Sequence, residues 1–296
     1  MKIESDLNDY LTTREIAELL RLKERKVYDL AASGKIPCSR ATGKLLFPRQ
    51  AIESWVRDHA SGGDSIANVT RAGVLLGSHD PLLEWAIRES RCGLASILDS
   101  SLDGVSRFRN GEGIACGMHV YDSEQAEWNR PMIESDFGGQ PVVLVGWARR
   151  QRGIIVSRKN IDQITKLEDL SGRKMIPRQA EAGSQVLLNT LLRKESFNSG
   201  LINWTLPARS EVDAVVAVQE DKADATFGLA TLAAQFQLGF TPVIEEQFDL
   251  LVDRRAWFEP AWQTLVNFCR TTQFNDRAAE LVGYDISELF RVRFNA

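Results

Sequence analysis

The chain of 296 residues is long enough for more than one domain, and its 44% hydrophobic and 26% charged residues are typical of a globular protein. The formal net charge of −4 is unevenly divided. Residues 11–57 hold ten Lys or Arg against five Asp or Glu, whereas residues 60–296 hold 25 against 31. A basic first part ahead of an acidic remainder excludes a general polyanion binder and favours a nucleic-acid contact confined to the beginning of the chain.

The sequence shows no sign of secretion, of a membrane or of a metal site. The first residues lack the apolar core of a signal peptide, and no apolar run approaches the ~18 residues that span a bilayer. The cysteines are scattered without metal-type spacing and suggest reduced thiols: Cys38, Cys92, Cys116 and Cys269. The three histidines are equally dispersed. We therefore expect a cytoplasmic protein with no membrane contact and no metal.

Two short helices are predicted near the start of the chain. Thr12 and Glu15 form a capping box that opens a helix running through about Leu20. After a tight turn, a second helix runs over residues 23–33 and ends at Gly34, which tolerates the left-handed conformation that stops a helix. This order matches a helix-turn-helix, whose second helix enters the major groove of DNA.

A wing is predicted after these helices. Strands at residues 36–40 and 45–47 flank a turn in which Gly43 supplies a positive φ, and a third helix begins at Pro48. The candidate DNA-binding residues lie on the second helix and near the tip of the wing: Lys23, Arg25, Lys26, Tyr28, Arg40 and Lys44. Which of them contact bases and which contact phosphates stays open.

Residues 10–57 resemble the excisionase/MerR-type winged-helix family. The resemblance is carried by Leu-Thr-Thr-Arg-Glu-Ile-Ala-Glu-Leu-Leu at 11–20, Gly-Lys-Ile-Pro at 34–37 and the Phe-Pro-Arg before a Trp-containing helix. It implies a small DNA-binding domain over residues 1–59. Residues 60–70 are polar and contain glycines, which indicates a linker ahead of a second domain at 71–296.

The second domain alternates strands and helices, which is typical of α/β proteins with mostly parallel sheets. Strands are expected at 74–77, 114–117, 142–147 and 153–156, and helices at 183–193, 213–220, 229–238 and 260–271. Residues 240–252 suit a strand that returns between two lobes. The stretch 274–296 is expected to pack on a lobe or on a second subunit.

Three turns that are rich in hydroxyl groups precede predicted helices, at residues 77–81, 100–104 and 178–185. Helix N-termini present unpaired N–H groups and the positive end of the helix dipole, and ligands of open α/β sheets bind where strands hand over to helices. Each serine alone is usually only a helix cap. Three such turns that converge would form a ligand site.

These turns, with Gly-Met-His-Val-Tyr-Asp at 117–122 and Ala-Asp-Ala-Thr-Phe-Gly at 223–228, resemble the periplasmic-binding-protein-like domain of molybdate- and tungstate-responsive regulators. The resemblance implies a two-lobed α/β domain of type II that closes on a small ligand, here an oxyanion such as molybdate or tungstate, with no other cofactor. The candidate ligand-binding residues are Ser78, His79, Ser101, His119, Arg178, Ser184 and Thr226.

One turn departs from that family. Glu181 brings negative charge toward the expected seat of an anion, and Gln185 stands where the family has a cation. A small organic metabolite therefore stays open as the ligand.

The sequence as a whole predicts a cytoplasmic, ligand-responsive transcription regulator that binds a double-stranded DNA operator as a homodimer. No nucleophile elbow, phosphate-binding loop or dinucleotide fingerprint is found, so an enzyme is not expected. An excisionase-like DNA-binding protein with a non-sensing body is the alternative.

Overall fold

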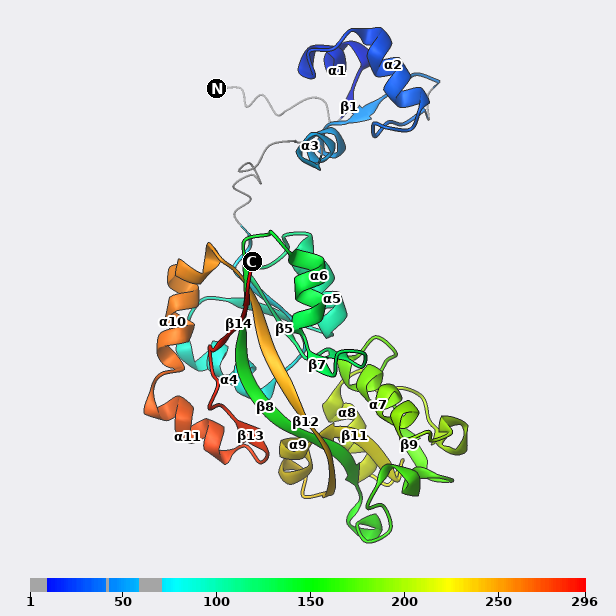
Figure 1. The fold of residues 1–296 in the computed structure, drawn as a ribbon, viewed down its shortest axis with the longest axis vertical. Helices are drawn as coiled ribbons and strands as arrows, with labels where there is room; N and C mark the ends of the chain where they lie inside the picture. The colour runs from blue at the N-terminus through cyan, green and yellow to red at the C-terminus, as the bar shows by residue number, and fades with distance from the viewer. Residues whose placement is uncertain (1–9, 41–42, 59–70) are drawn as a thin grey trace, which may run out of the picture. The chain divides into compact units, whose positions relative to one another are not determined.

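The computed structural model in Figure 1 describes residues 10–40, 43–58 and 71–296. The chain divides into two compact units, Met1–Thr70 and Arg71–Ala296, which are considered one at a time. Within the described residues, no helix is long and apolar enough to cross a membrane.

The first unit contains three short helices, α1 (Thr13–Leu19), α2 (Glu24–Ala32) and α3 (Arg49–Asp58). The expected capping box is present, since Thr12 and Glu15 exchange hydrogen bonds at the start of α1. Ile16, Val27 and Ile52 are fully buried between the helices, so apolar residues from all three helices share one small core.

The wing differs from the prediction. Among the described residues of the wing, one bridge joins Ser39 to Leu46, and strand β2 (Phe47–Pro48) pairs with β1 (Tyr10–Leu11) instead of continuing the hairpin. Phe47 is fully buried in the core of the unit, and this burial holds the second wing segment beside β1. Residues 41–42 of the predicted turn lie outside the described residues.

The second unit has two lobes of α/β structure (Figure 1). The first lobe contains the parallel strands β3 (Val74–Gly77), β4 (Ala95–Leu98) and β5 (Ala115–Met118), with helices α4 (Pro81–Ser90), α5 (Ser101–Arg109), α6 (Arg130–Phe137), α10 (Pro260–Phe268) and α11 (Thr272–Glu280). The second lobe contains β9 (Lys174–Ile176), β10 (Asn203–Trp204) and β11 (Ala225–Leu229), with helices α7 (Gly183–Lys194), α8 (Glu211–Gln219) and α9 (Ala230–Gln235).

Two long antiparallel strands, β8 (Val142–Val156) and β12 (Gly239–Asp253), run through both lobes. The strand order is β10-β9-β11-β8-β12-β5-β3-β4, so the sheet is mixed and not mostly parallel as expected. The strands predicted at 142–147 and 153–156 are one continuous strand. The middle of β8 is polar and resembles a loop in sequence. It crosses from one lobe to the other, and its buried arginines pair there with carboxylates.

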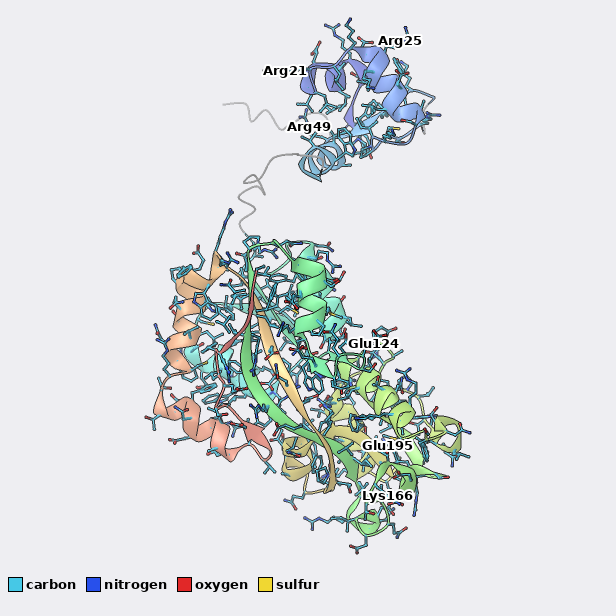
Figure 2. The ribbon with its side chains drawn as sticks, viewed as in Figure 1. Arg21, Arg25, Arg49, Glu124, Lys166 and Glu195 are labelled. Carbon is cyan, nitrogen blue, oxygen red and sulfur yellow. The ribbon has the colours of Figure 1, made fainter. Side chains whose placement is uncertain are left out.

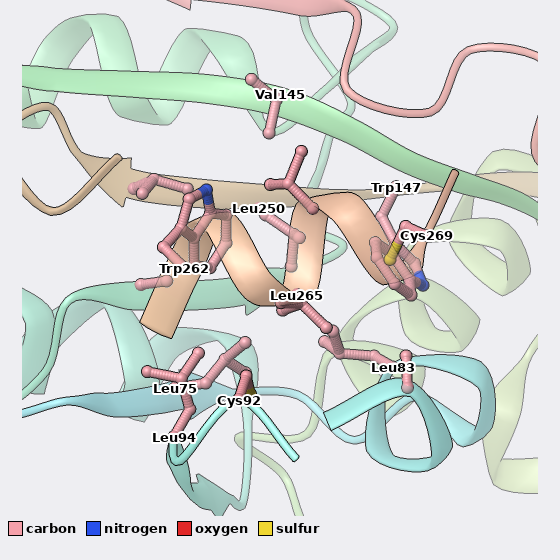
Figure 3. Close-up of a cluster of buried hydrophobic side chains, with 14 of the residues drawn as sticks. Leu75, Leu83, Cys92, Leu94, Val145, Trp147, Leu250, Trp262, Leu265 and Cys269 are labelled. Atoms are coloured by element: carbon pink, nitrogen blue, oxygen red, sulfur yellow. The ribbon is translucent and has the colours of Figure 1, made fainter. Parts of the chain in front are cut away.

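The C-terminal stretch packs on the first lobe. Strands β13 (Tyr284–Asp285) and β14 (Val292–Asn295) both pair with β8. Figure 3 shows the core of this lobe, in which Trp262 and Leu265 of α10 lie against the sheet residues Val145 and Leu250. The first lobe is thereby a sheet covered by packed helices.

Candidate ligand-binding site between the two lobes

Two of the predicted serines meet in the first lobe. Ser78 follows β3, Ser101 opens α5, and their hydroxyl oxygens lie 2.7 Å apart. The backbone N–H of His119, which follows β5, donates to Oγ of Ser101 at 3.1 Å. All three residues are buried. The carboxyl ends of β3 and β5 thus bring these groups to the edge of the sheet where α/β proteins bind ligands.

The second lobe reaches the same place through the start of α7. A Cβ atom on Gly183 would lie 3.1 Å from Nε2 of His119 and 3.2 Å from Oγ of Ser101. Ser184, the next residue, is also buried. The structure therefore brings Ser78, Ser101 and the Gly183–Ser184 turn together, from segments that are far apart in the sequence.

The N-terminus of α7 has no side-chain cap, in contrast to the other helices that begin near this place. Asp80, Ser100 and Ser210 accept a backbone N–H at the starts of α4, α5 and α8, respectively. Ala182 offers no such acceptor to α7. Among the described residues no partner is found for the N–H groups of Gly183 or Ser184. These two donors are free for a ligand.

Arg178 lies on the loop ahead of α7 and contributes further donors. Its Nη1 donates to the carbonyl of Ala208 at 2.7 Å, and its buried Nε has no hydrogen-bond partner in the described part of the chain. Burial lowers the pKa of its guanidinium, and Glu211 is a nearby charge that opposes this effect. The side-chain oxygen of Gln185 accepts a hydrogen bond from the backbone N–H of Arg178 at 2.9 Å. Gln185 therefore holds this loop and adds no charge to it.

Three other predicted features lie apart from this arrangement. The exposed His79 contacts Glu84 at 2.8 Å, on the surface of α4. The hydroxyl of Thr226 donates to the carbonyl of Ile176 and joins β11 to β9. Glu181 is exposed to solvent. The geometry therefore favours Ser78, Ser101, His119 and Ser184 as the residues that act together, while Arg178 lies on the adjoining loop and contacts Ala208 and Gln185.

Sequence reasoning missed a buried cluster of charges beside these residues. Asp80 accepts hydrogen bonds from Leu83 N, Trp147 Nε1, Arg150 Nη1 and Tyr284 Oη at 2.8 to 2.9 Å. Arg150 also contacts Glu246, its cross-strand partner on β12. Asp80, Arg150 and Glu246 are all fully buried. The cluster ties the first lobe and the C-terminal stretch to the crossing strands.

Arg152 extends the cluster to the second lobe. It donates to Glu246 through Nε at 2.6 Å and Nη2 at 3.0 Å, and to Glu211 of α8 through Nη1 at 2.7 Å. Burial by itself raises the pKa of Glu246, but Arg150 and Arg152 outweigh it and hold that pKa well below its usual range. Charged groups of both lobes and of the crossing strands thus form one connected network.

In the first unit, the predicted DNA-binding residues lie at the surface. Lys23, Arg25 and Lys26 are exposed at the start of α2, and Tyr28 is 51% exposed. Arg40 and Lys44 are exposed on either side of the wing turn. Figure 2 labels Arg25 and also Arg21. Arg21 is an exposed, positively charged residue in the turn before α2, and sequence reasoning did not select it.

Family models match parts of both units. Residues 10–60 match a helix-turn-helix domain model, and residues 84–270 match a PBP superfamily domain model. The chain is 22% identical over 300 residues to the uncharacterized protein YvgK of Bacillus subtilis, covering 93% of this chain and 94% of that one.

Similarity to a solved structure agrees with this fold. The regulatory domain of MetR, a LysR family regulator from N. meningitidis, has a TM-score of 0.51 at 12% identity, over 72% of this chain and 95% of that chain. A tungstate ABC transporter structure from Geobacter sulfurreducens has a TM-score of 0.48 at 11% identity, over 69% and 95%. Because the PBP superfamily model spans more than half of the chain, this protein belongs to the PBP superfamily and carries a helix-turn-helix domain ahead of the PBP-like domain.

Proposed function

We propose that this protein is a DNA-binding transcription regulator whose second domain closes on a small anionic ligand. The joining of a helix-turn-helix domain to a PBP-like domain fits a regulator of this kind. A ligand changes DNA binding only if it binds the open and closed arrangements of the lobes with different affinity. The protein acts in the cytoplasm, where operator DNA lies, and a homodimer would match the two-fold symmetry of an operator.

One observation carries the ligand-binding part of this proposal. The uncapped start of α7 in the second lobe lies against Ser101 and His119 of the first lobe. Free N–H groups at a helix N-terminus attract anions, and a hydrogen bond to a charged oxygen contributes about 1.5–3 kcal/mol. A ligand held there touches both lobes and therefore favours their closure.

The ligand is an anion on this proposal, and oxyanions, among which the sequence resemblance implies molybdate and tungstate, are the first class to test. Arg178, on the loop directly ahead of α7, supplies a partly buried positive charge whose Nε has no hydrogen-bond partner among the described residues. We also propose that the site binds and does not catalyse. The hydroxyls of Ser78 and Ser101 bond to each other, and the hydrogen bond between His119 and Ser101 runs through the backbone N–H and not the ring.

The proposal is tested with the full chain and fluorescent operator DNA, taken from the region upstream of its own gene. Molybdate, tungstate, phosphate and a panel of small carboxylates are added singly, and the thermal unfolding midpoint and the affinity for DNA are measured. We expect at least one anion to raise the midpoint and to change the DNA affinity. A chain that binds DNA equally well with every anion, and whose midpoint none of them shifts, would be the excisionase-like alternative.

A further inference from the structure

The electrostatic surroundings of His119 fix where its ring carries a proton. Its side chain is buried and stacks on Phe248, with ring centroids 5.9 Å apart. Nδ1 lies 3.1 Å from Oε2 of Glu246, off the line of an ideal hydrogen bond. Because this carboxyl stays ionised, a lone pair on Nδ1 would face a negative charge. The proton of the neutral ring therefore lies on Nδ1.

The second ring nitrogen of His119 is then a hydrogen-bond acceptor. Burial lowers the pKa of the imidazole, Glu246 only partly offsets this, and Arg150 and Arg152 lower it further, so the ring is neutral at physiological pH. Nε2 faces the start of α7, because a Cβ atom on Gly183 would lie 3.1 Å from it. Among the described residues, His119 has no hydrogen bond at Nε2. A hydrogen-bond acceptor on a buried ring thus lies at the place where the two lobes meet.

The second lobe presents the opposite chemistry at this place. The N–H groups of Gly183 and Ser184 are unpaired donors, and the guanidinium of Arg178 has donors beyond the one bound to Ala208. A ligand bound beside the contact between Gly183 and His119 meets donors of the second lobe and an acceptor of the first. An anion that consists only of acceptors satisfies the donors but places an oxygen against the lone pair of His119.

We propose that the ligand of this site combines an anionic group with a hydrogen-bond donor, an O–H or N–H that Nε2 of His119 accepts. The proposal rests on the ligand-binding function above and narrows its ligand class. Hydrogen phosphate and small hydroxy- or amino-carboxylates have this chemistry. Sulfate, molybdate and tungstate carry no proton at neutral pH, and the site discriminates against them in the way that a buried polar group rejects a ligand that leaves it unpaired.

Calorimetry on the full chain measures the affinity for matched probes. Inorganic phosphate is compared with sulfate and molybdate, and hydroxy- and amino-carboxylates are compared with carboxylates of the same length that lack the donor. Comparing phosphate with the carboxylates shows whether the anionic group of the ligand is a phosphate or a carboxylate. We expect the donor-bearing member to bind at least about tenfold more tightly. We expect His119→Gln, whose amide can present a donor, to reduce this preference about tenfold. The matched control is His79→Gln, which changes an exposed histidine paired with Glu84.

A second measurement does not depend on how the variants fold. ¹⁵N spectra of the histidine side chains report which ring nitrogen is protonated, and His79→Gln assists their assignment. We expect an unprotonated Nε2 in His119 whose resonance shifts when the donor-bearing ligand binds. A protonated Nε2, or molybdate binding as tightly as phosphate with no change in His119→Gln, overturns this inference alone. Failure of every anion to bind overturns the proposed function with it.

Discussion

Gly183 at the start of α7 stands directly against the ring of His119. A Cβ atom at position 183 would lie 2.9 Å from Cε1 of that ring, which is closer than real Cβ contacts come. The ring has little freedom to yield, since it is buried and lies between Phe248 and Glu246. The approach of the two lobes at this place therefore depends on the absence of a side chain on Gly183.

Gly183→Ala is expected to hold the lobes apart and to weaken ligand binding by about tenfold or more, because the extra methyl group opposes closure. The affinity for the tightest-binding anion of the panel is measured by calorimetry. Amide hydrogen exchange of the first turn of α7 checks that the lobes have separated. Gly73→Ala is the matched control, since a Cβ atom there meets only Leu94 at an ordinary 3.7 Å. Equal ligand affinity in both variants would contradict the expected role of Gly183.

The pair formed by Glu211 and Arg152 offers a second test, of the connection between the lobes. Glu211→Gln leaves Arg152 with Glu246 as its remaining ionic partner. We expect the free energy of unfolding to fall by about 1–3 kcal/mol, since Glu211 is partly exposed and a fully buried pair would lose more. Urea denaturation at neutral pH measures this change.

The control for Glu211→Gln is Asp221→Asn, which breaks an ion pair with Lys159 whose side chains are 60% and 58% exposed. Exposed pairs contribute about 0–1 kcal/mol, so this variant should stay close to the parent protein. If the two variants lose the same amount of stability, the network between the lobes is no stronger than a surface ion pair.

Resemblance to two known families was sufficient to predict the fold class, while helix caps and hydrophobic periodicity, which are local patterns, predicted individual helices and strands. The sequence also selected Ser78, Ser101 and Ser184, which the structure brings together, although their roles stay predictions. It failed at the middle of β8. Arg150 and Arg152 resemble loop residues until their partners are known, and the partners Glu211, Asp80 and Glu246 lie 59, 70 and 94 residues away. Long-range pairing that compensates for desolvation leaves no local signal.

Asp249 on β12 makes stability depend on pH. Burial raises the pKa of its carboxyl to about 6, although Asn129, Gln247 and Arg293 act in the other direction. The unfolded value is about 3.9, so between pH 4 and 6 the folded chain binds more protons than the unfolded chain. The contribution of this group to stability is therefore present at about pH 4 and is lost as the pH rises through 6.

Asp249→Asn should remove this loss and stabilise the protein at pH 7.5 by on the order of 1–3 kcal/mol, while the two proteins converge near pH 4. Urea unfolding at a series of pH values measures the difference. Asp285→Asn is the control, because the N–H and hydroxyl of Ser287 lower the pKa of Asp285 and its effect has the opposite sign. A stability difference for Asp249→Asn that does not change with pH would contradict the raised pKa.

The start of α2 is expected to carry the contact with DNA. Lys23, Arg25 and Lys26 are exposed there, and none of them has an ion-pair partner among the described residues. If Lys23 and Lys26 bind phosphates, Lys23→Ala with Lys26→Ala should weaken operator binding and lower the slope of log affinity against log salt by about 1.8, or about 0.9 for each contact. Fluorescence anisotropy at several salt concentrations gives this slope. The control is Arg14→Ala, which removes a positive charge of α1 that is paired with Glu18 and should leave the slope unchanged. A lost affinity with an unchanged slope in the double variant would assign these lysines to base contacts instead, because base recognition depends much less on salt.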